Sequence, residues 1–535
     1  MATTAISPVP SSVSRNPVRS RNSVRRSELG FAAALVSLLT GLVLLIHGYH
    51  PYAEDGGLYM AGIKWLLDPT LYPHGTGFVT EHLRFSLFAP MVAALVRQSH
   101  LSLPIVLLLL HLASIWLVLF AAWLLAARGY GSRKSRVGAV SLLAMWITLP
   151  IAGTSLLLMD PYVTARSFST PCVLFALIGM IDFLRPATNL RTDRWRGLVL
   201  CGASLIVATA MHPLMAAYGL GCVLVLGCLL SPIRWLRLWG TTALCLAALG
   251  IAAAIQVLAP AADALYRQVA MTRYYWFLGD WHWYELLGLA APLIILAGVG
   301  IVGLGVQKED TAARSALARM AIVCGVVGVA VAMLFARPQS STLMVSGLQP
   351  LRIFQIVYIV MILAVGSVFA EWVLQRHWWR WAAMFSLLAG VMFFAERRTF
   401  PNSAQLELPW TLPQNQWEQA FLWIRHNTPK TALFALDAHY ITSSGEDAQC
   451  FRAIAERSVL PDYSKDGGEA SITRALTTAW EVGEIAQARI DIESDAQRIA
   501  ALKPLGVTWV VLKRDADTEF DCAYTNESVK VCRLP

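Results

Sequence analysis

Apolar runs of about 20 residues recur from Leu29 to Ala395 and restrict this chain to one class of fold. Each run is long enough to cross, as a helix, a hydrocarbon core roughly 30 Å thick. The composition agrees, because 56% of the 535 residues are hydrophobic and 14% are charged. Soluble domains carry about 25% charged residues. We therefore predict a polytopic α-helical membrane protein.

The basic residues give a formal net charge of +9 at pH 7 and cluster at the ends of the apolar runs. Membrane proteins use such clusters to fix their topology, because Lys and Arg concentrate in cytoplasmic loops. We therefore exclude nucleic acid as a partner. Residues 1–27, rich in Ser, Pro and Arg, are predicted to be a disordered cytoplasmic tail. A signal peptide is the alternative for Leu29–Ile46, but no small-residue cleavage site precedes His47 and the run is long enough to span.

One topology with about eleven helices places every basic loop of residues 28–397 in the cytoplasm. It puts the N-terminus inside and the C-terminus outside, as in a multi-pass protein of the bacterial cytoplasmic membrane. If the short segment Leu83–Val96 crossed the membrane, the later basic loop ARGYGSRKSR would lie outside, against this rule. We therefore expect an interfacial or re-entrant helix there. Crossings include Leu29–Ile46, Leu103–Ala126, Val137–Ile151, Trp239–Leu258, Trp381–Ala395 and a hairpin that turns at His212-Pro213.

From Glu396 the composition becomes that of a soluble domain, and residues 398–535 are predicted to form an extracytoplasmic α/β domain in the periplasm. Helical periodicity and β-rich runs divide it into elements. The helices are Gln414–His426, Asp447–Arg457, Ala475–Ile490 and Ser494–Lys503; the strands are Thr431–Leu436, Val507–Lys513, Asp521–Tyr524 and Val529–Arg533. Cys522 and Cys532 flank the last turn. A disulfide and two unrelated thiols are both open at this point.

The first outer loop, residues 47–88, is rich in polar residues in a chain where charge is scarce. Loops of this length in compact proteins are usually functional or disordered, and its Trp, Tyr and Leu content excludes disorder. Glu54 and Asp55 precede Gly56-Gly57, which lets the backbone approach a neighbour closely. Asp160 lies in a second outer loop, MDPYVTARS, where Asp-Pro is also a common turn opener. A carboxylate here can act as a general base or hold a divalent cation.

Six arginines fall on the outer side, although Lys and Arg usually concentrate in cytoplasmic loops. Arg binds phosphate oxygens through a bidentate fork, so basic residues there can bind an anion. Arg352, where a loop enters an apolar helix, lies at the depth of phosphate headgroups; snorkelling to ordinary lipid is the alternative. The six are Arg84, Arg166, Arg267, Arg273, Arg337 and Arg352. The aromatic loop at Pro260–Glu285 is read as an interfacial belt, with a sugar platform as the alternative.

This layout resembles the GT-C superfamily of membrane glycosyltransferases, which includes protein O-mannosyltransferases, aminoarabinose transferases and oligosaccharyltransferases. The segments FLWIRHNTPKTALFALDAHY and FRAIAERSVLPDYSKDGG are similar to outer domains of bacterial membrane proteins of this type. The resemblance implies inverting transfer of a sugar from a polyprenyl-phosphate-linked donor to an acceptor at the outer membrane face. It implies catalytic roles for Asp55 and Glu54, metal binding by Asp55 and Asp160, and lipid-phosphate binding by Arg352, Arg337 and Arg166.

The resemblance leaves the cofactor unknown, with Mg²⁺ or Mn²⁺ as options, and no WWD-like acceptor motif is present in the tail. Two other functions stay open. A transporter or lipid-handling protein predicts ionisable residues at mid-membrane depth and inverted repeats. A scaffold with an outer binding domain predicts no chemistry at all.

Overall fold

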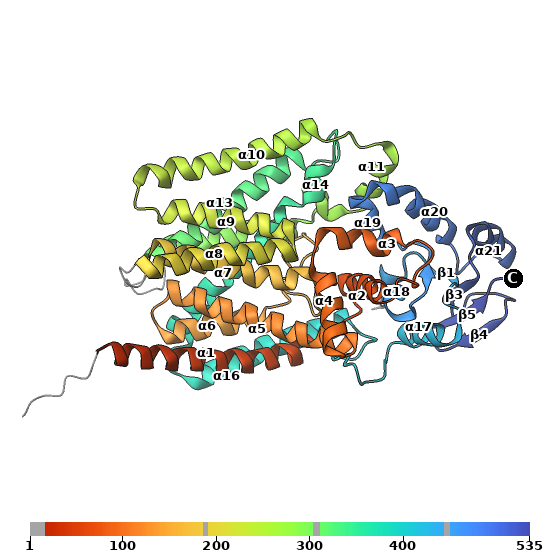
Figure 1. Cartoon of the computed structure of the whole chain (residues 1–535), viewed down its shortest axis with the longest axis horizontal. Helices are drawn as coiled ribbons and strands as arrows, with labels where there is room; N and C mark the ends of the chain where they lie inside the picture. The colour runs from red at the N-terminus through yellow and green to blue at the C-terminus, as the bar shows by residue number, and fades with distance from the viewer. Residues whose placement is uncertain (1–16, 186–190, 303–310, 443–449) are drawn as a thin grey trace, which may run out of the picture.

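The computed structural model describes residues 17–185, 191–302, 311–442 and 450–535. The molecule is an elongated bundle of helices with the C-terminal domain at one end (Figure 1). The helices of the first loop lie at the junction between the two: α2 (Glu54–Leu67), α3 (Gly77–Thr80) and α4 (Phe88–Ser99). The loop that the sequence singled out is therefore a layer of ordered structure between bundle and domain.

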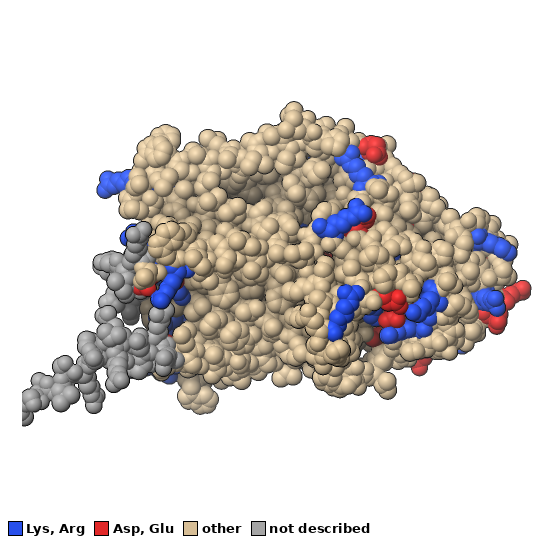
Figure 2. All heavy atoms as spheres, viewed as in Figure 1, with Lys and Arg blue, Asp and Glu red and all other residues tan. Residues whose placement is uncertain are grey.

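Within the described residues, nine helices are long and apolar enough to cross a membrane. The side of the bundle seen in Figure 2 is largely free of Lys, Arg, Asp and Glu, which gather towards its two ends and on the C-terminal domain. This distribution supports the predicted multi-pass class. The long helices are α1 (Pro17–His47), α5 (Leu103–Gly129), α7 (Ala165–Leu184), α8 (Arg191–Met211), α9 (Pro213–Leu230), α10 (Thr241–Leu258), α13 (Thr311–Phe335), α15 (Phe354–Phe369) and α16 (Trp378–Thr399).

The predicted crossing at Val137–Ile151 is shorter than the sequence indicated, and a second helix of the bundle is also short. The run at Val137–Ile151 forms α6 (Arg133–Met145), which has 13 residues. An α-helix rises about 1.5 Å per residue, so α6 spans roughly 20 Å of a core roughly 30 Å thick. The helix α12 (Trp283–Leu296) has 14 residues and continues into η5 (Ala297–Val302).

Other boundaries differ from prediction near the N-terminus and at one bend. Residues 17–27, predicted to belong to a disordered tail, form the first turns of α1, and residues 1–16 lie outside the described residues. The segment predicted as interfacial or re-entrant does not run straight. Gly77–Phe85 and Phe88–Ser99 meet at 99°. Such a bend fits a re-entrant loop or a broken span. The predicted hairpin turn is confirmed, because α8 ends at Met211 and α9 begins at Pro213.

Helices α7 and α8 pack backbone against backbone through two glycines. A Cβ atom added at Gly179 would lie 2.5 Å from the amide nitrogen of Cys201 and 2.6 Å from the carbonyl oxygen of Gly197. Small residues at such contacts are typical of membrane helices, whose association depends on close van der Waals packing. This packing fixes α7, the helix that carries Arg166.

The C-terminal domain has a five-stranded mixed sheet in the order β2-β1-β3-β5-β4. Helices α17 (Gln416–Asn427) and α18 (Phe451–Ala455) pack on one face, and α21 (Asp495–Leu502) on the other. Alternate residues of β3 face the two layers, since Val511 lies with α17 and Val510 with α21. The strands are β1 (Leu433–Ala435), β2 (Ser458–Val459), β3 (Trp509–Lys513), β4 (Cys522–Thr525) and β5 (Val529–Arg533).

The predicted strands and most helices of this domain are present, with three differences. Strand β2 and helix α19 (Lys465–Ile472) were not predicted. The predicted helix Asp447–Arg457 is shorter, as α18, and residues 443–449 lie outside the described residues. Cys522 and Cys532 lie opposite each other on β4 and β5 and form a disulfide.

The contact between α7 and α8 gives a stability prediction. Gly179→Ala should destabilise the bundle by about 1 to 3 kcal/mol, because the methyl group forces two backbones apart. Gly202→Ala is the matched control, since a Cβ added at Gly202 on α8 meets nothing within 4 Å. The thermal midpoint of the detergent-solubilised protein should fall for the first variant and hold for the second. Equal midpoints would contradict the backbone contact.

Candidate functional site

Asp55 lies in the first turn of α2, which is wedged between the second loop and the C-terminal domain. A Cβ added at Gly56 would lie 2.9 Å from the ring of Tyr162 in the second loop. One added at Gly57 would lie 2.3 Å from the Cβ of Cys450 in the C-terminal domain. The Gly56-Gly57 pair therefore allows the close approach that the sequence predicted, and it sets the position of the Asp55 backbone.

The C-terminal domain contributes a cation to this acidic pair. Lys465, the first residue of α19, places its Nζ atom 3.2 Å from Oδ1 of Asp55 and also forms an ion pair with Glu54. No local pattern predicted a role for this residue, because the Gly-Gly pair in SKDGGEAS disfavours a helix and is typical of a turn. The partner of Asp55 was therefore missed together with the element that carries it.

Asp160 and Arg166 form a buried ion pair beside Asp55, with 2.5 Å between an oxygen of Asp160 and Nη2 of Arg166. Asp55 interacts electrostatically with Arg166 and Arg352. Arg352 in turn interacts with Asp55, with Arg166 and with the hydroxyls of Tyr218 and Tyr275. The structure thus brings Asp55, Glu54, Asp160, Arg166 and Arg352 into one cluster.

The electrostatics of the cluster keep Asp55 ionised. Burial favours the neutral acid, but Lys465, Arg166 and Arg352 outweigh it and lower the pKa of Asp55 from 3.8 to about 2. The side chain is nevertheless 41% exposed. Solvent therefore reaches this carboxylate, and we name its surroundings the Asp55 recess. For Asp160, burial outweighs the attraction of Arg166 and raises the pKa.

Two residues beside this recess adopt a strained backbone conformation. Glu54 has a φ of 50° and Gln349 a φ of 51°, in the left-handed region that non-glycine residues rarely occupy. Glu54 adjoins Asp55, and Gln349 accepts a hydrogen bond of 2.7 Å from Nε of Arg352. Strain of this kind costs about 1 to 3 kcal/mol and clusters at functional sites.

Helix α19 is held in place from several directions. Asp466 accepts two hydrogen bonds of 2.7 Å from Nη1 of Arg452, and both side chains are buried. Asp462 accepts a hydrogen bond of 2.6 Å from the amide of Lys465. Arg273 donates to the carbonyl oxygens of Ser464 and Tyr463 at 2.6 and 2.7 Å. These bonds fix the start of the helix and therefore the position of Lys465.

The remaining outer arginines do not join the cluster. Arg337 lines a separate groove of about 800 Å³ between α12 and α13, whose other lining residues are mostly apolar. Arg267 donates to the carbonyl oxygens of Pro338 and Ser340, and Arg84 pairs with Glu81 at the surface. In the aromatic loop, Trp276 and Trp281 are buried in the protein, whereas Trp283 and Tyr284 are exposed.

The donor set of the cluster does not fit a bound divalent metal. Asp160 is engaged by Arg166 and Asp55 by Lys465, so each carboxylate already faces a cation. Across the described parts of the chain, no group of three or more His, Cys, Asp and Glu side chains converges. We therefore route no chemical step through a metal.

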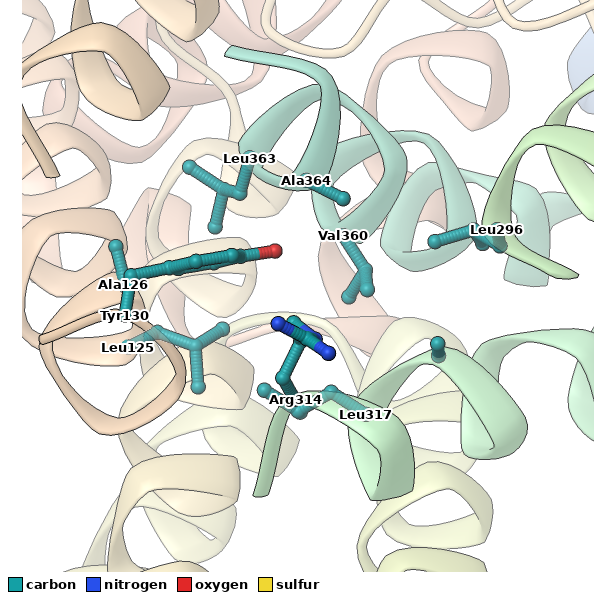
Figure 3. A pocket seen from close by; sticks show the side chains of 10 residues that line it. Leu125, Ala126, Tyr130, Leu296, Arg314, Leu317, Val360, Leu363 and Ala364 are labelled. Atoms are coloured by element: carbon teal, nitrogen blue, oxygen red, sulfur yellow. The ribbon is translucent and has the colours of Figure 1, made fainter. Parts of the chain in front are cut away.

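A second buried arginine lies away from this cluster. Arg314, near the start of α13, points into a pocket beside Tyr130 and the α15 residues Val360 and Leu363 (Figure 3). The pocket has a volume of about 20 Å³. A water molecule needs roughly 10 to 15 Å³ by this measure, so the space suits water and is too small for a sugar or a lipid headgroup. The recess at Asp55 remains the candidate site.

The anchoring of α19 gives a second stability prediction. Arg452→Met should lower the free energy of unfolding by about 3 to 5 kcal/mol, because it leaves the Asp466 carboxylate buried without its cation. Lys430→Met is the control: its pair with Asp68 is exposed on both sides, and loss of an exposed pair costs about 1 kcal/mol or less. Urea titrations of the purified protein compare the two. Equal losses would contradict the role of Arg452 as the anchor.

The sequence matches no protein-family model and no curated protein. What this site does must therefore be inferred from its own chemistry: an exposed, ionised carboxylate, two arginines beside it and a lysine from another domain.

Proposed function

We propose that this protein transfers a sugar from a polyprenyl-phosphate-linked donor to an acceptor at the membrane surface. The observation that carries the proposal is that Arg166 and Arg352 both act electrostatically on Asp55, whose helix α2 lies between the bundle and the C-terminal domain (Figure 1). An acid next to two guanidinium groups serves both partners of such a transfer. The acid faces the acceptor, and the arginines face the phosphate that leaves.

Arg352 and Arg166 are the proposed ligands of the donor phosphate. Guanidinium groups stabilise the negative charge that grows on the phosphate as the bond to the sugar breaks. Among the residues that the structure describes, the buried Nε of Arg166 has no hydrogen-bond partner, so this donor can bind a phosphate oxygen. Arg352 is half-buried in the recess, where a phosphate can reach it.

Asp55 is proposed to orient the acceptor rather than to take its proton. A carboxylate with a pKa of about 2 is a weak base at neutral pH. It is a strong hydrogen-bond acceptor, however, and can align a hydroxyl group with the anomeric carbon of the donor. Lys465 occupies part of its surface and would be displaced or shared when the acceptor binds.

A groove between α12 and α13, separate from the Asp55 cluster, has the chemistry of a lipid site. It has a volume of about 800 Å³, mostly apolar walls and Arg337 at one end. A lipid with an anionic head and a long apolar tail has matching chemistry. In this proposal the C-terminal domain and the Asp55 recess lie on the periplasmic side, and the N-terminus lies in the cytoplasm.

The transporter alternative receives less support. It requires ionisable residues deep within the membrane helices. In α5 and α7 the charged residues are Arg128, Arg166 and Asp182, and all three lie in a first or last turn. Arg128 and Asp182 pair with each other at 2.7 Å.

The lipid that copurifies with the protein tests the donor class. Mass spectrometry of detergent-extracted protein should find a polyprenyl phosphate enriched over bulk phospholipid. Added polyprenyl phosphate should raise the thermal midpoint, and polyprenol without the phosphate should not. Arg352→Gln should abolish this stabilisation, whereas Arg84→Gln, at an exposed residue of the first loop, should keep it. Stabilisation of wild type and Arg352→Gln alike by polyprenol would rule out phosphate recognition.

The role of Asp55 is tested by turnover in membranes that contain the native donor pool. Asp55→Asn should reduce release of polyprenyl phosphate by at least about 100-fold, because the amide loses the charge that aligns the acceptor. Expression should be unchanged, and the thermal midpoint should fall only slightly, because Lys465 keeps its ion pair with Glu54. Asp517→Asn, at an exposed site of the C-terminal domain, is the control. Wild-type turnover by Asp55→Asn would end the catalytic assignment.

A further inference from the structure

Helix α19 presents a second ionisable group to the Asp55 recess. Glu469 follows Lys465 by four residues, and residues four apart in a helix lie on the same face. Lys465 touches Asp55, so this face is turned towards α2. Glu469 is only 7% exposed and interacts electrostatically with Asp55. Glu469 also interacts electrostatically with Tyr59, which lies one helical turn after Asp55.

Glu469 differs from the other acids of its segment in having no partner. Asp466 is bound by Arg452, and Asp462 caps the amide of Lys465. Within the described residues, no hydrogen bond or ion pair involves the Glu469 carboxyl group. Among these residues, no partner therefore competes with a bound acceptor for this carboxyl group.

The surroundings of Glu469 favour its neutral form. Burial is the main cause, and the negative charges of Asp466, Asp55 and Glu81 add to it, raising the pKa from 4.5 to about 8. A group whose pKa lies near the working pH is well matched to proton transfer. Asp55 and Glu469 thus form two carboxyl groups with opposite properties, one held ionised and the other able to gain and lose a proton.

We propose that Glu469 is the general base of the transfer and takes the proton from the acceptor hydroxyl. This rests on the proposed function. The acceptor oxygen forms a bond to the anomeric carbon of the sugar while the bond from that carbon to the phosphate oxygen breaks. The electron pair leaves with the polyprenyl phosphate, and the acceptor proton moves to a carboxylate oxygen of Glu469. Solvent then removes this proton, which restores the base.

The assignment gives the C-terminal domain a part in the chemistry. Its helix α19 would supply both Lys465, which holds Asp55, and Glu469, which receives the proton. The titratable and charged groups around Glu469 come from α19, α2, the segment after α3 and the residues just after α11 (Ala264–Met271). They are Asp466, Lys465, Asp55, Tyr59, Glu81, His82 and Arg273.

The protonation state of Glu469 can be measured without any substrate. Infrared spectra of wild type at neutral pH should show the C=O stretch of a buried carboxylic acid, which Glu469→Gln lacks. Because the folded pKa is raised, the stability of wild type should fall as pH rises from 4.5 to about 8. Glu469→Gln should remove this part of the fall. Glu527→Gln, at an exposed turn, should leave both signals intact. An unchanged spectrum in Glu469→Gln would overturn the proposal.

Turnover then tests the role of the proton. Release of polyprenyl phosphate from native membranes should rise with pH through about 8, because the base must be ionised. Glu469→Gln should lower the rate at least about 100-fold and lose this dependence, while binding of polyprenyl phosphate stays normal. Normal turnover by Glu469→Gln beside an active wild type would overturn the base assignment alone. Absence of turnover by wild type would instead count against the proposed function, and the infrared result would still decide the protonation state.

Discussion

The contact between Lys465 and the Glu54-Asp55 pair joins the two parts of this molecule. It links α2, which follows the first long helix, to α19 of the C-terminal domain. The contribution of this ion pair to stability depends on its burial, since an exposed ion pair contributes little. Here the lysine is enclosed, and the neighbouring negative charges raise its pKa. The acid that faces the recess therefore depends on a domain encoded some 400 residues later.

Close packing and electrostatics act together at this junction. Gly56 and Gly57 let α2 lie against Tyr162 and Cys450, where any side chain would clash. Buried hydrogen bonds from Arg452 and Arg273 fix the start of α19. The pKa values of the two carboxyl groups, Asp55 and Glu469, are therefore shifted in opposite directions. Three cations hold Asp55 ionised, whereas Glu469 is buried among acids without a cationic partner. A site that both orients a hydroxyl and accepts its proton needs this difference.

The arginines show why residue type alone does not identify a site. The sequence placed six arginines on the outer side and singled out Arg352, Arg337 and Arg166 for phosphate binding. In the structure, two of the other three bind backbone carbonyls and one lies at the surface beside Glu81. Arg337 lies on a groove of its own, and only Arg166 and Arg352 meet Asp55. A guanidinium group can bind a phosphate, a carboxylate or a carbonyl oxygen, and the neighbours brought by the fold decide among them.

The sequence by itself determined the membrane class, the long helices, the hairpin at His212 and most strands of the C-terminal domain, because apolar length and periodicity are local properties. It also marked Asp55, because this acid belongs to an acidic pair before two glycines in the polar first outer loop. Tertiary structure decided the rest. Helix α19 forms despite its glycines because Asp466 and Arg452 pair across the domain, and Ala470 packs between α3 and α11. The partners of Asp55, which are Lys465, Arg166 and Arg352, come from three distant segments. No local pattern encodes contacts between segments that only the completed fold brings together.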